Sequence, residues 1–302
     1  MSAAGSMSRT LEGRASAKGT VFGRQGASIR YWVHGGGGEP MVLCNGLFSG
    51  VALWDRFVDH FSHTHRVLLW EYPGHGVLGG SDSRRGVSIG SFAEEGLLLL
   101  EGVGIDAAVF VGYGVGVQVI LEIYRRRPGA VKALVGLCGA DKGRLSRLAP
   151  FRRGRQIAAR SAENVLVPLG TPFWKALTWL WGASTLLEDK EPVAHTDGMY
   201  GPKAWLGQIS RTDPRIGLRS LASSWFYHPG SLLSQIKVPV LILGGAEDRL
   251  VPARHYARMV RRIPGSRLEL LEGCSHRAVS RMPERVNSLV EEFLAARDLA
   301  GR

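Results

Sequence analysis

The sequence has few cysteines and no hydrophobic run long enough to cross a membrane. Its three cysteines, Cys44, Cys138 and Cys274, lie far apart without a Cys-x-x-Cys pair, which argues against a disulfide framework or a structural zinc site. No apolar run reaches the ~20 residues that a membrane-spanning helix needs. The N-terminal residues lack the apolar segment of a secretory signal. These absences favour a soluble protein in a reducing compartment, and we expect a cytoplasmic one.

Acidic residues are also scarce relative to basic ones. The 26 Asp and Glu stand against 38 Lys and Arg, which gives a formal net charge of +12. Such a charge attracts polyanionic surfaces loosely, but no nucleic-acid-binding motif accompanies it. The basic stretch 142–160 is either a solvated face or a weak peripheral contact for an anionic membrane or an acyl carrier. We expect a small-molecule substrate, no nucleic-acid partner and no cofactor, and the oligomeric state stays open.

Short apolar segments alternate with amphipathic ones along most of the 302 residues. A buried strand typically reads as a short, nearly continuous apolar run, and a helix as an apolar stripe at helical spacing. Such alternation predicts an α/β fold, with a mostly parallel sheet wrapped by helices. The predicted strands are 28–34, 41–44, 67–70, 107–111, 131–137, 238–243 and 268–271, and helices are predicted at 51–63, 91–103, after 116, at 253–262 and at the C-terminus.

The alternation stops between residues 142 and 234. This stretch is first basic and then rich in aromatic residues, which include Trp174, Trp179 and Trp181. We expect a helical lid over 142–234, set into a core of 19–141 and 235–302, after a flexible basic tail over 1–18. The aromatic stripe has three interpretations: buried core, the underside of the lid above a substrate cleft, or a helix at a membrane surface.

A glycine stands at the centre of the turn where chemistry is expected. The segment Gly112-Tyr113-Gly114-Val115-Gly116 follows a predicted strand and precedes a predicted helix, which is the setting of the G-x-S-x-G nucleophile elbow. Both outer glycines are present, but Gly114 replaces the serine. Because glycine has no side chain, the acyl-serine route is closed. Glycine adopts the strained backbone of such an elbow freely, so we expect the fold to persist.

With this turn, four further segments make the chain resemble the lidded α/β-hydrolase superfamily over about residues 19–299. Leu43-Cys44-Asn45-Gly46-Leu47 resembles the oxyanion segment, and Trp70–Gly76 resembles the family's Asp-x-x-Gly-x-Gly loop with Glu71 in place of the aspartate. The segments around Asp248 and His276 resemble those that carry the triad acid and histidine, in the chain order that this fold uses.

The resemblance implies a role for each of these residues. His276 would act as general base and then general acid, and Asp248 would orient and stabilise its ring. The backbone N–H groups of Leu47 and Val115 would form the oxyanion hole, which does not depend on side chains. Substrate contacts are expected from the following aromatic residues: Phe48, Tyr113, Trp174, Trp179 and Trp181.

Other nucleophiles and ligands are less convincing. The three cysteines lie near the expected site in sequence, but buried cysteine is usually inert. His60, His63 and His65 lie at the end of a predicted helix with no acid nearby except Asp59, which favours a solvated helix end over a metal site.

Two functions of different class remain open. The first is an enzyme that acts on an apolar or amphipathic ester, thioester or lactone with the His276–Asp248 pair and the oxyanion hole, by general-base hydrolysis or by cofactor-free non-hydrolytic chemistry. The second is a catalytically inactive binding or regulatory relative that retained the pocket. A chance glycine variant of an ordinary serine hydrolase is a further alternative, which restoring the serine would reveal. We favour the first because both Asp248 and His276 are present.

Overall fold

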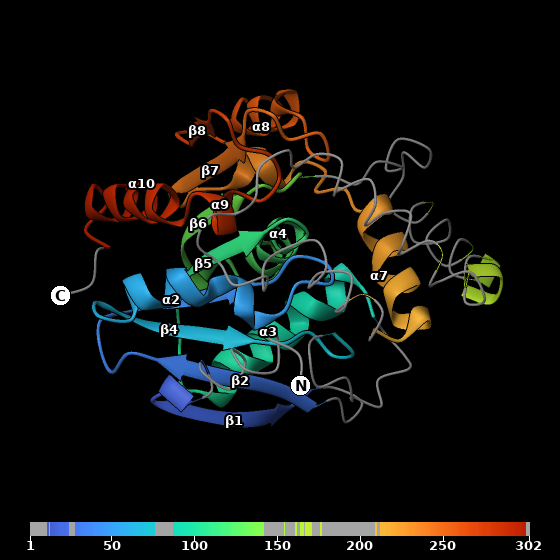
Figure 1. Ribbon diagram of the computed structural model, residues 1–302, viewed down its shortest axis with the longest axis horizontal. Helices are drawn as coiled ribbons and strands as arrows, with labels where there is room; N and C mark the ends of the chain where they lie inside the picture. Colours follow the sequence, from blue (N-terminus) through green and yellow to red (C-terminus); the bar gives the residue numbers. More distant parts are fainter. Residues whose placement is uncertain are drawn as a thin grey trace.

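The computed structural model describes residues 11, 13–23, 28–75, 87–141, 154, 161, 164–165, 167–170, 176, 209 and 212–299. Within these residues an eight-stranded sheet has the order β1-β2-β4-β3-β5-β6-β7-β8 (Figure 1). β1 pairs antiparallel with β2 and β2 antiparallel with β4, whereas all pairings from β4 through β3 to β8 are parallel. The predicted α/β fold is confirmed. The strands are β1 (Ala17–Phe22), β2 (Ser28–His34), β3 (Glu39–Cys44), β4 (His65–Trp70), β5 (Ala108–Tyr113), β6 (Val131–Leu137), β7 (Val240–Gly245) and β8 (Arg267–Leu271).

Helices cover both faces of this sheet, so its central strands are apolar on both sides. On β5, Phe110 packs with the cluster that holds α3, α4 and α8, whereas Val111 packs with the cluster that holds α2 and α10. The helices are α2 (Asp55–Phe61), α3 (Ile89–Gly102), α4 (Gly116–Arg126), α7 (Pro214–Phe226), α8 (Ala253–Val260), α9 (Ala278–Arg281) and α10 (Pro283–Ala295), with short 3-10 turns at Val51–Trp54, Pro128–Ala130 and Leu232–Gln235.

The N-terminal segment packs on the sheet domain earlier than its sequence indicates. Ala17 and Lys18, which fall within the predicted tail, belong to β1. Before them, the Leu11 side chain is buried against the α2 face, and Arg14 forms ion pairs with Asp55 and Asp59. The described part of this segment is therefore held by apolar contacts and a charge cluster, and by hydrogen bonds from Ser16 to the Val33 and Gly35 carbonyls.

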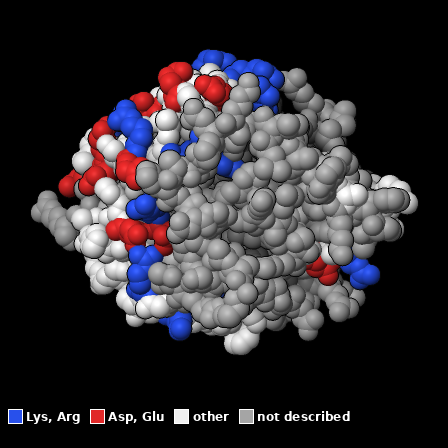
Figure 2. All heavy atoms as spheres, viewed as in Figure 1, with Lys and Arg blue, Asp and Glu red and all other residues white. Residues whose placement is uncertain are grey.

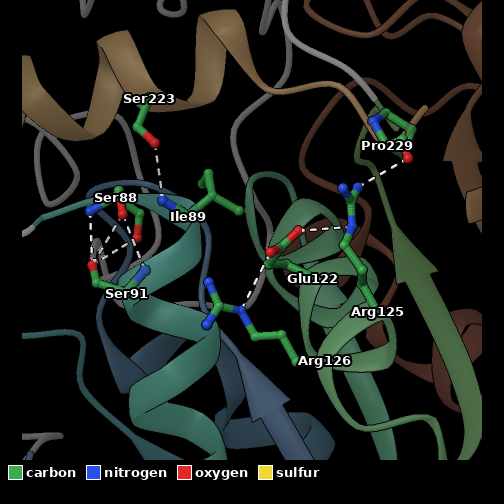
Figure 3. Close-up of polar contacts among 8 residues, drawn as sticks. All are labelled: Ser88, Ile89, Ser91, Glu122, Arg125, Arg126, Ser223 and Pro229. Atoms are coloured by element: carbon green, nitrogen blue, oxygen red, sulfur yellow. Dashed lines mark hydrogen bonds and ion pairs between the residues drawn. The ribbon is translucent and has the colours of Figure 1, made fainter. Parts of the chain in front are cut away.

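Helix α7 stands beside the carboxyl ends of the parallel strands and is fixed there by polar contacts (Figures 1 and 3). The Ile89 N–H, at the start of α3, donates to Ser223 Oγ at 3.0 Å. After α7, Arg125 Nη2 donates to the Pro229 carbonyl at 2.9 Å, while its Nε lies 3.1 Å from Glu122 Oε2. These contacts position α7 above the strand ends, where the parallel sheet of an α/β fold places its ligands.

Within the described residues, no helix combines the length and the apolar character that a membrane span requires.

Tight packing at the first residue of α4 gives a prediction about stability. A Cβ on Gly116 would lie 2.2 Å from the Cys44 carbonyl oxygen, whereas a Cβ on Gly129 would meet no atom within 4 Å. Gly116→Ala should therefore lower the free energy of unfolding by ~1–3 kcal/mol, as overpacking does. Gly129→Ala should range from no change to a gain of about 1 kcal/mol. Urea unfolding of the two variants measures the difference, and equal midpoints would contradict this packing.

Candidate active site

The turn from β5 to α4 presents bare backbone to the site. Gly114 has φ +55°, in the left-handed region that glycine adopts without strain. Its N–H donates to the Leu137 carbonyl at 2.9 Å, and its own carbonyl accepts from the Val117 N–H at 3.2 Å. These bonds fix the turn between β6 and the first turn of α4.

His276 faces the position that a side chain on residue 114 would occupy. A Cβ on Gly114 would lie 3.6 Å from His276 Nε2 and 3.8 Å from Gly46 Cα, with no closer contact. The structure therefore brings the elbow, the histidine and the oxyanion segment together, as the resemblance implied. It leaves room for a serine side chain that the sequence does not supply.

His276 is held through its ring and through its backbone. Its Nδ1 lies 2.8 Å from Asp248 Oδ2, and the Tyr113 hydroxyl donates to its backbone carbonyl at 3.0 Å. Since Nδ1–H donates to the carboxylate, Nε2 carries the lone pair that a general base needs. The side chain of His276 remains 19% exposed, whereas that of Asp248 is fully buried.

Asp248 is a buried carboxylate with three hydrogen-bond donors. Oδ2 accepts from the Tyr256 hydroxyl at 2.6 Å as well as from His276, and Oδ1 accepts from the Val251 N–H at 2.8 Å. Burial alone would raise the pKa of Asp248, but the hydrogen bond and charge of His276, with the bonds from Tyr256 and Val251, hold it below its usual value. Asp248 therefore stays ionised and can stabilise an imidazolium ion.

The oxyanion segment leaves β3 and is fixed through the side chain of Asn45. Asn45 Nδ2 donates to the Trp70 carbonyl at 2.7 Å, and its Oδ1 accepts from Trp54 Nε1 at 2.7 Å. In the described part of the chain, neither the Leu47 N–H nor the Val115 N–H donates a backbone hydrogen bond. The Val115 N–H directly follows Gly114 in the chain, and Leu47 follows Gly46, whose Cα would lie 3.8 Å from a Cβ on Gly114.

A small apolar cluster joins this segment to α7. Phe48, which is 2% exposed and has φ +60°, packs beneath α7 instead of standing free in a cleft. Phe48 thus lies beside the predicted oxyanion hole. The cluster comprises Phe48, Ile209, Leu218 and Leu221, with Leu47, Val167 and Trp225 against it.

Of the other predicted substrate-binding residues, three lie outside the described part of the chain and Tyr113 lies within it. Trp174, Trp179 and Trp181 lie outside the described residues, as does most of the basic stretch 142–160. Tyr113 is buried and contacts the site through its ring, 5.5 Å from that of His276 between centroids. On the face seen in Figure 2, the described Lys and Arg side chains are interspersed with Asp and Glu.

The three cysteines and the histidines at 60, 63 and 65 are the other candidates for a nucleophile and a metal site, and their surroundings do not favour either role. All three thiols are free and buried, and burial raises the pKa of Cys44 to about 12 and that of Cys138 further. His60 pairs with Glu291, and His65 contacts Leu299. The described residues contain no cluster of three or more metal-ligating side chains.

Tyr256 is the site residue that the sequence reasoning missed. It falls within the predicted helix 253–262, where a tyrosine at this spacing indicates only core packing. Its proximity to Asp248 depends on how α8 leaves the turn after β7, which no local pattern encodes.

Comparison with known proteins agrees with this fold. Residues 41–289 match the alpha/beta hydrolase family. The chain is 25% identical over 272 residues to the carbamate hydrolase RutD of Azorhizobium caulinodans, covering 88% of this chain and 95% of that protein. It is 29% identical over 282 residues to a 2-hydroxy-6-oxononadienedioate/2-hydroxy-6-oxononatrienedioate hydrolase of Burkholderia vietnamiensis, covering 88% and 90%. A hydrolase from Pseudomonas aeruginosa has the same fold, with a TM-score of 0.75 and 20% identity, covering 93% of this chain and 99% of that one.

The lowered pKa of Asp248 predicts how stability depends on pH. Because the folded pKa lies below the unfolded value of ~3.9, the ionised carboxylate stabilises the fold above that value, and this contribution is lost as pH falls through the folded pKa. Asp248→Asn should lower the free energy of unfolding by ~2–4 kcal/mol at neutral pH, and the deficit should shrink below about pH 4. Urea unfolding across this range tests it. Glu272→Gln, at an exposed position, is the control, and a deficit independent of pH would contradict the assignment.

Proposed function

Because the chain belongs to the alpha/beta hydrolase family, we propose that it hydrolyses apolar or amphipathic acyl substrates, such as esters, thioesters or lactones, without an acyl-enzyme intermediate. The observation that carries the proposal is the position of His276 Nε2, 3.6 Å from where a Cβ on Gly114 would lie, with Nδ1 bound to Asp248. The imidazole is thus oriented toward the place of the missing nucleophile.

In this mechanism a water molecule takes the place of the serine hydroxyl. His276 Nε2 removes a proton from the water as its oxygen bonds to the acyl carbon, and Asp248 stabilises the imidazolium ion that forms. The carbonyl oxygen becomes an oxyanion that accepts from the Leu47 and Val115 N–H groups. When the intermediate collapses, the bond to the leaving group breaks, and the imidazolium returns the proton to that group.

The expected rate follows from the groups that remain. General-base catalysis contributes ~10²–10⁴-fold, and each oxyanion donor contributes ~10²–10³-fold. Glycine removes covalent catalysis but leaves both of these contributions. The reaction should therefore be slow for this fold and still well above the background rate.

The substrate class is supported by what surrounds the site. The cluster of Phe48, Leu218 and Leu221 lies beside the oxyanion segment, and an apolar wall favours an apolar acyl group. The relatives from Azorhizobium caulinodans and Burkholderia vietnamiensis are both named hydrolases, which supports a reaction with water over a non-hydrolytic one.

One observation favours a second function, a binding or regulatory relative without catalysis. A serine at φ +55° would add strain of ~1–3 kcal/mol, which glycine avoids. Replacing serine by glycine thus relieves backbone strain in the turn and removes the nucleophile. Both effects would suit a protein that only binds its ligand.

The first test compares the native chain with Gly114→Ala and Gly114→Ser on p-nitrophenyl esters of increasing acyl length. The native chain should turn over without a burst. Gly114→Ala should lose at least about tenfold, because its methyl group, 3.6 Å from His276 Nε2, occupies the place of the water that this base must activate. Gly114→Ser differs from it by one oxygen and should form an acyl-enzyme with a kinetic burst.

Two controls separate this chemistry from a contaminating serine hydrolase. His276→Ala should lower the native rate by ~10²–10⁴-fold. A fluorophosphonate should inactivate Gly114→Ser and leave the native rate unchanged. A silent native chain beside an active Gly114→Ser would overturn the proposal in favour of the binding relative, and silence of all folded forms would exclude acyl hydrolysis on this panel.

A further inference from the structure

We propose that Tyr256 is a positioning residue that sets the base strength of His276 by sharing one carboxylate oxygen with it. The inference deepens the proposed function, and its kinetic arm rests on that function. It does not follow from the family resemblance, which concerns only the acid, the histidine and the backbone donors.

The geometry places two donors on one acceptor atom. Asp248 Oδ2 accepts from the Tyr256 hydroxyl at 2.6 Å and from His276 Nδ1 at 2.8 Å. Hydrogen bonds to a charged acceptor are the strong ones in proteins. Each donor withdraws electron density from the oxygen that the other uses, so the phenol weakens the hold of the carboxylate on the imidazole proton.

The backbone is shaped to admit this phenol. Tyr256 is completely buried on α8, and a Cβ on Gly244, near the end of β7, would lie 2.2 Å from its Cε2 atom. Gly244 thus leaves space for the ring beneath Asp248. Burial and the neighbouring carboxylate raise the pKa of Tyr256 far above its usual value, so the hydroxyl remains a donor throughout the working range.

A weaker carboxylate suits a base that must act on water directly. Only neutral imidazole removes a proton, and a strongly basic Asp248 would keep the imidazole protonated to higher pH. Through its hydrogen bond to Oδ2, Tyr256 makes the carboxylate less basic. The imidazole of His276 then stays neutral to lower pH, while Asp248 remains ionised. The cost is a smaller stabilisation of the imidazolium ion during the reaction.

The other titratable groups around this pair do not supply the effect. Tyr113 on β5 and Cys138 after β6 face Asp248, and burial raises the pKa of both, so both stay uncharged near neutral pH. Cys274 lies near Tyr113 and Cys138, and the Arg277 cation acts on Tyr113. Among the described residues, the Tyr256 hydroxyl and the Val251 N–H are the donors that Asp248 has besides His276.

The test is a proton NMR titration of the His276 ring in the native chain and in Tyr256→Phe, with the resonance identified by its loss in His276→Ala. Removing the hydroxyl should move the titration midpoint to higher pH by about 0.5–1 unit. Tyr124→Phe is the matched control, because it also removes a buried hydroxyl, whose bonds go to the backbone of Gln235 and Lys237. Its midpoint should equal the native one.

The kinetic arm follows the acidic limb of kcat/KM against pH, which should move in Tyr256→Phe by the same amount as the midpoint. A folded Tyr256→Phe with an unchanged or lowered midpoint would overturn the inference. A raised midpoint in a chain that hydrolyses nothing would sustain the inference and overturn the proposed function, so the two failures are distinguishable.

Discussion

The turn from β5 into α4 must pass between two other loops, and this constraint determines the rest of the site. Its bonds to Leu137 and Val117 fix the course of the chain, while Gly116 lies against the Cys44 carbonyl with no space for a side chain. This close approach holds the segment after β3 against the turn, with Gly46 beside Gly114. A Cβ on Gly114 would extend toward His276 Nε2 without a contact closer than 3.6 Å, so that a change at this one residue alters the chemistry where the packing tolerates it.

The sequence predicted most of this framework because the framework is local. β6 was expected at 131–137 and is found there, and the expected pairing of Asp248 with His276 is present at 2.8 Å. The strand follows from a short apolar run, which local physics interprets well. The pairing follows from the resemblance of the two segments to those that carry the triad acid and histidine.

The features that escaped prediction depend on contacts that the residue pattern of the segment itself does not show. β1 is exposed along most of its length and lacks the apolar alternation of a half-buried strand, so pairing with β2 defines it. Phe48 was expected to contact substrate, yet whether it does depends on α7, more than 160 residues later, whose place is set by contacts such as Ser223 with Ile89. Tyr256 follows Asp248 closely in the chain, but its helical spacing indicates only core packing, and the direction in which α8 leaves the turn brings its hydroxyl to the carboxylate. In each case the sequence shows the residue type, whereas the contact depends on the three-dimensional arrangement.

Asp248 and His276 differ in what they indicate about function. Asp248 is buried and satisfied by donors from three segments, the turn at Val251, helix α8 and the loop after β8, so it joins these segments whether or not the protein is active. Removing it disturbs structure and chemistry together. His276 is different, because its Nε2 has no hydrogen-bond partner among the described residues and yet is aimed at the space beside Gly114. The bond from Nδ1 to Asp248 fixes the ring, so that Nε2 is directed to this space by the structure itself. A test of function must therefore address Nε2, because a change at Asp248 removes the structural support of the ring together with any chemistry.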